Sequence, residues 1–106
     1  MTRVYRRRAA REDIEAAIQF YLTETSDRVA LGFVDAVEAE INAVRTYPDS
    51  GSPRIGQESG VPHLRSQRTS GYPYLVFYRA VEDHVEILRV LHASRDLPNI
   101  LSQLGD

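Results

Sequence analysis

The sequence contains neither cysteine nor lysine, and no apolar run in it approaches the roughly 20 residues that span a bilayer. Without cysteine the chain has no disulfide and no thiol chemistry, and nothing in it argues for an oxidising compartment. Without lysine, a phosphate-binding loop of the usual lysine-bearing kind is excluded. The N-terminal segment also lacks the apolar stretch of a signal peptide, so we expect a cytoplasmic protein with no membrane segment.

Sequence patterns for metal or cofactor chemistry are missing as well. There is no G-x-G-x-x-G or H-E-x-x-H pattern, and the three histidines are scattered, so we expect no metal site and no cofactor. His92, Ser94 and Asp96 resemble the residues of a hydrolase triad, but they lie too close together on one extended segment to converge. The sequence therefore favours binding over catalysis.

The arginines and the acidic residues are divided unevenly along the chain. Five arginines and no acidic residue precede Glu12, whereas nine acidic residues and two arginines lie between Glu12 and Asp49. Six arginines and four acidic residues lie between Arg54 and Arg95. The predicted helices are thus acidic and the predicted strands basic, which is typical of a face that meets an acidic partner or a nucleic acid.

Four segments have the residues of strands. Tyr74–Arg79 and Val85–His92 flank a short polar stretch, which predicts an antiparallel β-hairpin. Both faces of Val85–His92 are largely apolar, as is typical of an inner strand. Arg3–Arg7 is predicted as an edge strand whose charges discourage aggregation, and His63–Arg68 as a further strand.

Two segments, Ala9–Thr23 and Asp27–Thr46, carry apolar residues at helical spacing, and Ser26 is expected to cap the second helix. Three prolines and three glycines in segment 48–62 predict a loop without a regular element. The order β-α-α-β-β-β predicts an α+β fold with an N-terminal helical hairpin on one face of an antiparallel sheet. We expect one domain over residues 1–106, ending in a short C-terminal tail in which Asn99 can cap a last helical turn through Leu104.

Arginines on the predicted strands are the strongest candidates for a binding site. Arg65, Arg68 and Arg89 fall on neighbouring strands and are expected to gather on one face, with Arg79 and Arg95 nearby. Such a cluster can bind phosphate or carboxylate groups. The alternative is that some of these arginines form ion pairs across the hairpin, and this interpretation is favoured for Arg79.

The tyrosines and the last histidine are open to two interpretations each. Tyr72, Tyr74 and Tyr78 can stack on nucleic-acid bases, but such tyrosines more often pack their rings into the sheet. His92 can transfer protons, but a hydrogen-bonded structural histidine at a strand end is the favoured interpretation.

Several motifs of this chain resemble the ParE branch of the RelE/ParE toxin superfamily. They are Tyr47-Pro48 followed by Gly51, Leu64-Arg65, the run Tyr72–Tyr78, and Ile87–His92 with Arg95-Asp96. The resemblance covers nearly the whole chain from Ala9 onward. It implies the toxin of a type II toxin–antitoxin system, as in plasmid stabilisation, which inhibits DNA gyrase and is neutralised by a cognate ParD-like antitoxin in a hetero-oligomer.

The resemblance leaves two alternatives. RelE members cleave mRNA on the ribosome, and in that case Arg65, Arg89 and His92 would supply the charge and the base, although the missing lysines disfavour it. The second alternative is a ParE-like domain that binds only its antitoxin and is not toxic. In the leading interpretation no residue is catalytic. The partner-binding residues are then expected to be Arg65, Arg68, Arg89, His92, Arg95, Asp96 and Leu97.

Overall fold

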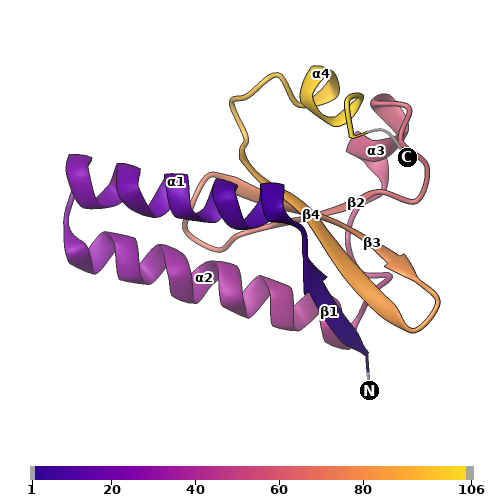
Figure 1. Cartoon of the computed structure of the whole chain (residues 1–106), viewed down its shortest axis with the longest axis horizontal. Helices are drawn as coiled ribbons and strands as arrows, with labels where there is room; N and C mark the ends of the chain where they lie inside the picture. The colour runs from indigo at the N-terminus through magenta and orange to yellow at the C-terminus, as the bar shows by residue number, and fades with distance from the viewer. Residues whose placement is uncertain (1, 105–106) are drawn as a thin grey trace.

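Residues 2–104 are described by a computed structural model, in which four helices surround one four-stranded sheet (Figure 1). Residues 1, 105 and 106 lie outside this described part. The elements are β1 (Arg3–Arg6), α1 (Arg8–Glu24), α2 (Asp27–Thr46), α3 (Arg54–Glu58), β2 (Arg65–Arg68), β3 (Tyr74–Val81), β4 (His84–His92) and α4 (Leu97–Leu101). This is an α+β fold, as predicted.

The strand order in the sheet is β1-β4-β3-β2. The predicted hairpin is confirmed, since β3 pairs antiparallel with β4, and β4 is an inner strand because β1 lies on its other side. β1 runs parallel to β4, so the sheet is mixed and not antiparallel throughout. Short turns force β2, β3 and β4 to alternate in direction, whereas the long connection after β1 imposes no such constraint.

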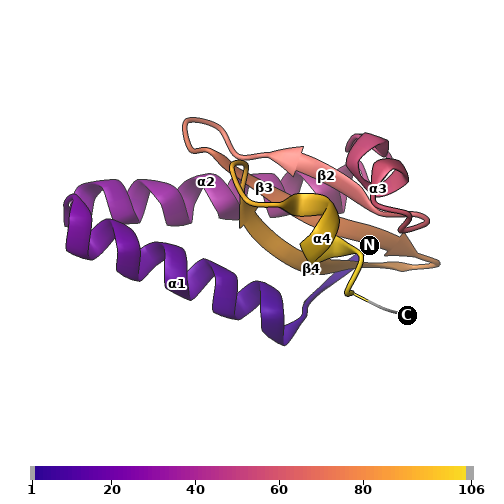
Figure 2. The ribbon, with the colours of Figure 1, turned by 90° about the horizontal axis from the view of Figure 1, so that it is seen from above.

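The helices α1 and α2 form a hairpin that covers one face of the sheet (Figure 2). Ser26 caps α2 as predicted, because its side chain accepts a hydrogen bond from the Val29 backbone N–H at 3.3 Å. The apolar stripes of both helices pack against this face, as predicted. We call this the hairpin-side core; its fully buried members include Ala10, Phe33, Val37, Val44, Val76, Tyr78, Val85 and Ile87.

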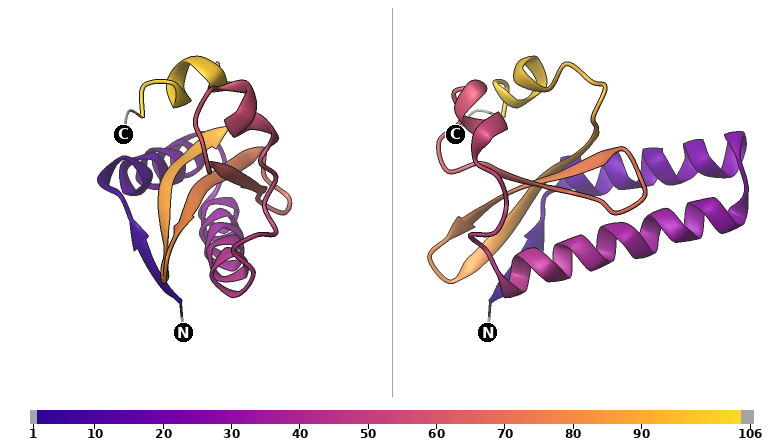
Figure 3. Two further views of the ribbon diagram at one scale, coloured as in Figure 1. Left: turned by 90° about the vertical axis from the view of Figure 1, so that its right-hand side faces the viewer. Right: turned by 180° about the vertical axis from the view of Figure 1, so that it is seen from behind.

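The short helices α3 and α4 cover part of the opposite face of the sheet (Figure 3). We call their contact with the sheet the α3-side core; its buried members are Leu64, Phe77, Leu88, Leu91, Leu97 and Leu101. The prediction that segment 48–62 has no regular element is therefore wrong, because α3 lies within it. A single turn that begins after Pro53 is too short to show helical periodicity, yet proline suits a helix N-terminus.

The short C-terminal tail forms the helix α4, which packs against the sheet. Leu97 is only 8% exposed and Leu101 is fully buried, so α4 is fixed to the sheet. None of the helices in residues 2–104 is long and apolar enough to cross a membrane.

Candidate functional site

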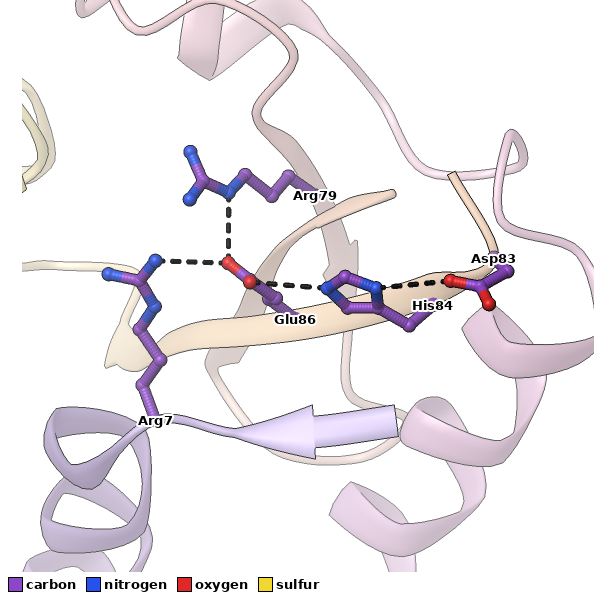
Figure 4. A network of polar contacts seen from close by, with 5 residues as sticks. All are labelled: Arg7, Arg79, Asp83, His84 and Glu86. Carbon is purple, nitrogen blue, oxygen red and sulfur yellow. Dashed lines mark hydrogen bonds and ion pairs between the residues drawn. The ribbon is translucent and has the colours of Figure 1, made fainter. Parts of the chain in front are cut away.

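Glu86 on β4 is the centre of a polar network on the sheet face that points away from α1 and α2 (Figure 4). Its Oε1 accepts hydrogen bonds from Arg7 Nη2 and Arg79 Nε, both at 3.0 Å. Its Oε2 lies 3.3 Å from His84 Nε2, and His84 Nδ1 lies 3.5 Å from Asp83 Oδ1. One carboxylate thus holds two guanidinium groups that come from different parts of the chain.

The register of the strands explains why these side chains meet. Glu86 is paired with Tyr5 on β1 and with Arg79 on β3, and His84 is paired with Arg3. Paired residues of a sheet point to the same face, so strands far apart in sequence place their side chains together. We call this set the Glu86 patch: Arg3, Tyr5, Arg7, Arg79, His84 and Glu86.

The Glu86 patch lies on the part of its sheet face that α3 and α4 leave uncovered. Phe77 is on the same face but is buried in the α3-side core, whereas Tyr5 is 49% exposed. The Tyr5 ring meets the His84 ring edge to face, with 5.2 Å between the ring centroids. Even with the nearby Asp83 carboxylate included, the arginines outnumber the carboxylates, so the patch carries a net positive charge.

Ionisation of Glu86 is favoured by its neighbours. Burial raises the pKa of Glu86, but hydrogen bonds from His84, Arg79 and Arg7 outweigh burial and lower that pKa below its ordinary value of 4.5. The carboxylate is therefore charged at neutral pH. The ion pair between Arg79 and Glu86 also confirms the structural interpretation that the sequence favoured for Arg79.

The predicted gathering of Arg65, Arg68 and Arg89 on one face is wrong. Arg65 and Arg68 stand three residues apart on β2, and residues an odd number apart on a strand point to opposite faces. Arg65 Nη1 donates hydrogen bonds to the carbonyl oxygens of Asp49 (3.1 Å) and Gly51 (2.7 Å). Arg65 therefore stabilises the loop that follows α2.

Arg89, which the sequence marked as an anion-binding residue, binds a carboxylate of its own chain. Its Nε and Nη2 donate to the two oxygens of Asp13 on α1, at 2.7 and 2.9 Å. The hydrogen bonds from Arg89 to Asp13 raise the pKa of Arg89. The same carboxylate accepts the Val90 backbone N–H at 3.0 Å, so Asp13 ties α1 to β4.

His92 is a hydrogen-bonded histidine at a strand end, as the sequence favoured. Its Nδ1 accepts the backbone N–H of Ser94 at 3.0 Å and lies 2.8 Å from the Ser94 hydroxyl oxygen. A backbone N–H can only donate, so Nδ1 carries no proton here and the neutral ring is protonated at Nε2. With its acceptor nitrogen already engaged by Ser94, His92 is poorly placed to act as a general base.

The three tyrosines of β3 and the preceding turn pack inward, which confirms the ring-packing interpretation. The Tyr72 hydroxyl donates to the Val29 carbonyl oxygen at 2.9 Å. Tyr78 is fully buried, and Tyr74 meets the Phe33 ring edge to face with 5.0 Å between the centroids. Tyr72 and Tyr74 are only partly buried, but both rings contact other aromatic rings of the hairpin-side core.

The remaining predicted partner-binding residues are Arg68, Arg95, Asp96 and Leu97. Arg68, Arg95 and Asp96 are exposed and free to contact a partner. Leu97 is buried in the α3-side core, so its side chain supports α4.

Sequence reasoning did not single out Arg3, Tyr5 or Arg7 as site residues. A signal for them was available, because residues that alternate along a strand share one face. The partner Glu86 lies far away in sequence, and only the pairing of β1 with β4 brings it to that face. Within residues 2–104, no group of three side chains of the metal-ligating types could hold a metal ion.

Similarity to known proteins extends over most of the chain. Residues 4–97 match the sequence model of a family described as the ParE toxin of the type II toxin–antitoxin system parDE. No curated protein matches the chain. A solved structure titled chromosomal ParDE TA system from P. aeruginosa has a TM-score of 0.75 and 21% identity, covering 87% of this chain and 96% of that chain. At this identity the structural likeness establishes the fold alone.

Proposed function

Because the chain belongs to the ParE toxin family of type II toxin–antitoxin systems, we propose that it is a cytoplasmic toxin that inhibits DNA gyrase and is neutralised by a cognate ParD-like antitoxin. The observation that carries this proposal is the family match over residues 4–97. The similar fold of a solved ParDE system supports an antitoxin as the partner.

We propose that the toxin acts by binding and not by catalysis. The three residues that a nuclease would need are engaged elsewhere. Arg89 is paired with Asp13, Arg65 holds loop carbonyl groups, and the Nδ1 of His92 accepts from Ser94. In addition, β3 lies between the strands that carry Arg65 and Arg89, so these two arginines are not neighbours in the sheet.

The surface that we propose for the antitoxin combines apolar and charged groups. Phe20 on α1 is 55% exposed and Leu31 on α2 is 65% exposed, so the helical hairpin has apolar surface for a partner to cover. Phe20 also lines a shallow groove of about 190 Å³ together with His92 and Arg95. An antitoxin segment with apolar residues and an acidic residue near Arg95 fits this surface. Apolar burial would supply most of its affinity, and the charges would speed association.

The test is a supercoiling and DNA-cleavage assay with purified gyrase and the purified protein. We expect loss of supercoiling and accumulation of cleaved DNA complexes, both reversed by the antitoxin. Primer extension on translating ribosomes is run in parallel, and new mRNA 5′ ends would favour the nuclease alternative. Unchanged supercoiling without cleaved complexes at saturating protein would reject gyrase as the target, and would leave the interpretation of a domain that only binds its antitoxin.

A further inference from the structure

We propose that the Glu86 patch binds the phosphate groups of a single-stranded nucleic acid. The proposal deepens the proposed function, on which it rests for the source of the strand, namely DNA held by gyrase. The site itself is inferred from the donors, the charge and the exposed ring on this face of the sheet.

Arg7 and Arg79 keep hydrogen-bond donors that Glu86 does not engage. A guanidinium group has five N–H donors. Glu86 engages only Nη2 of Arg7 and only Nε of Arg79. Figure 4 shows that the other terminal nitrogens of both arginines lie on the side of the carboxylate that points away from His84. Both terminal nitrogens of Arg79 remain available for a bidentate contact with an anion.

Glu86 prepares the two arginines for an anionic ligand. The carboxylate fixes two long side chains near each other, so binding an anion costs less side-chain entropy than it would for two mobile arginines. The charge of Glu86 cancels one of the two guanidinium charges and leaves the other for a ligand. A monoanionic phosphodiester matches this residual charge.

The exposed ring of Tyr5 favours a nucleic acid over an acidic peptide as the ligand. Tyr5 is on β1, between Arg3 on the same strand and Arg7, which directly follows the strand. Its side chain is 49% exposed and belongs to the same face of the sheet. Basic side chains interleaved with an exposed aromatic ring are the arrangement that binds single strands, because the bases stack while the backbone meets the charges. The carboxylate side chains of an acidic peptide have no ring that could stack on Tyr5.

The position of the patch agrees with this ligand. The patch is on the sheet face opposite the helical hairpin. The exposed apolar residues that we propose for the antitoxin are on the hairpin itself. The acidic residues of α1 and α2 are also on that other side, which would repel a nucleic acid and leave the Glu86 patch as the favourable approach.

The test measures binding of a fluorescent oligothymidylate of about 12 nucleotides by anisotropy at several salt concentrations. One phosphodiester neutralised by the residual charge predicts a slope of about −0.7 for log K against log salt, and Arg79→Gln should bring this slope close to zero. We expect Arg7→Gln and Arg79→Gln each to weaken binding about tenfold, and Tyr5→Ala to weaken it as well. Arg54→Gln, which removes an exposed arginine of α3, is the matched control and should bind like wild type.

The double variant Arg79→Gln/Glu86→Gln has the same net charge as wild type, so it separates a specific site from general charge. Binding that stays weak supports the site, and wild-type affinity in the double variant overturns it. Equal binding of an oligoglutamate peptide, unaffected by Tyr5→Ala, would also overturn it in favour of a carboxylate ligand. No gyrase is present in this assay. Normal oligonucleotide binding without gyrase inhibition would therefore reject the proposed function alone, and inhibition without binding would reject this site alone.

Discussion

The backbone N–H of Gly51 donates a hydrogen bond to the hydroxyl of Tyr78 at 2.9 Å, in the buried space between β3 and the loop that follows α2. The same hydroxyl donates to the Pro48 carbonyl oxygen at 2.8 Å. Burial raises the pKa of Tyr78, so the group stays protonated and able to donate. One side chain of the sheet thus fixes both ends of a tight turn.

Tyr78→Phe should therefore destabilise the protein by about 1–3 kcal/mol, because two buried backbone groups lose their partner. Gly51→Ala should destabilise it by a similar amount, about 1–3 kcal/mol, because a Cβ there would lie 2.4 Å from the Tyr78 hydroxyl and 2.9 Å from the Ser66 carbonyl oxygen. Urea unfolding measures both changes. Tyr47→Phe is the control, since Tyr47 is 68% exposed and its loss of a hydroxyl should change stability by less than about 0.5 kcal/mol. An unchanged urea midpoint for Tyr78→Phe would contradict this role.

Replacing either partner of the ion pair between Asp13 and Arg89 should cost about 2–4 kcal/mol, because the other charge would stay largely buried without its partner. Asp13→Asn and Arg89→Gln are measured singly and together by urea unfolding. We expect the double variant to be less destabilised than the sum of the two single variants, as for residues in direct contact. Additive effects would show that the two side chains do not support one another, and Arg89 would again be a candidate for partner binding alone.

Stability should fall in acid because two carboxylates have lowered pKa values in the folded protein. Hydrogen bonds from Arg6 lower the pKa of Glu38, and Glu86 is lowered against its burial by three neighbours. A lowered folded-state pKa contributes stability that is fully present above the unfolded value near 4.5 and is lost as pH falls through the folded value. Unfolding midpoints between pH 7 and pH 3 should show this decline. Glu86→Gln should be less stable than wild type at pH 7 but show a shallower decline in acid, whereas an equal decline would assign the effect to other groups.

Deleting the chain from Leu97 onward should unfold or severely destabilise the protein, because Leu97 and Leu101 belong to the α3-side core. Leu101→Ala alone should cost about 2–5 kcal/mol. Circular dichroism and urea unfolding are the measurements, with Asp96→Ala as an exposed control. A fully folded truncated protein would show that α4 contributes little to the core. Loss of toxicity in a truncated chain therefore cannot by itself identify α4 as a contact surface.

The sequence predicted the elements that depend on local pattern. The stripes of α1 and α2 and the strand residues of β3 and β4 determine their own conformation, and each was placed within a few residues. The helix α3 was missed because one helical turn leaves no periodicity. It is held by contacts with β2, and an added Cβ on Gly56 would lie 2.6 Å from the Leu64 carbonyl oxygen.

The site was less accessible to prediction, because it depends on which strands become neighbours. Asp13 and Arg89 are both charged and far apart in sequence, so neither residue shows that the other is its partner. The opposite directions of Arg65 and Arg68 followed from strand geometry and could have been predicted. The Glu86 patch required the parallel pairing of β1 with β4, which no local turn dictates.

That pairing also determines when the chain can fold. Arg3 on the first strand is in register with His84 on the last, so closing the sheet joins residues at nearly opposite ends of the sequence. Contacts of such long range form late, after the entropy of a large loop has been lost. Until β4 has been synthesised, β1 has no partner strand. The apolar stripes of α1 and α2 then also have no complete sheet to pack against. A polypeptide released by the ribosome before β4 has been made would thus lack the partner strand of β1, and the intact sheet exists only once β4 has been translated.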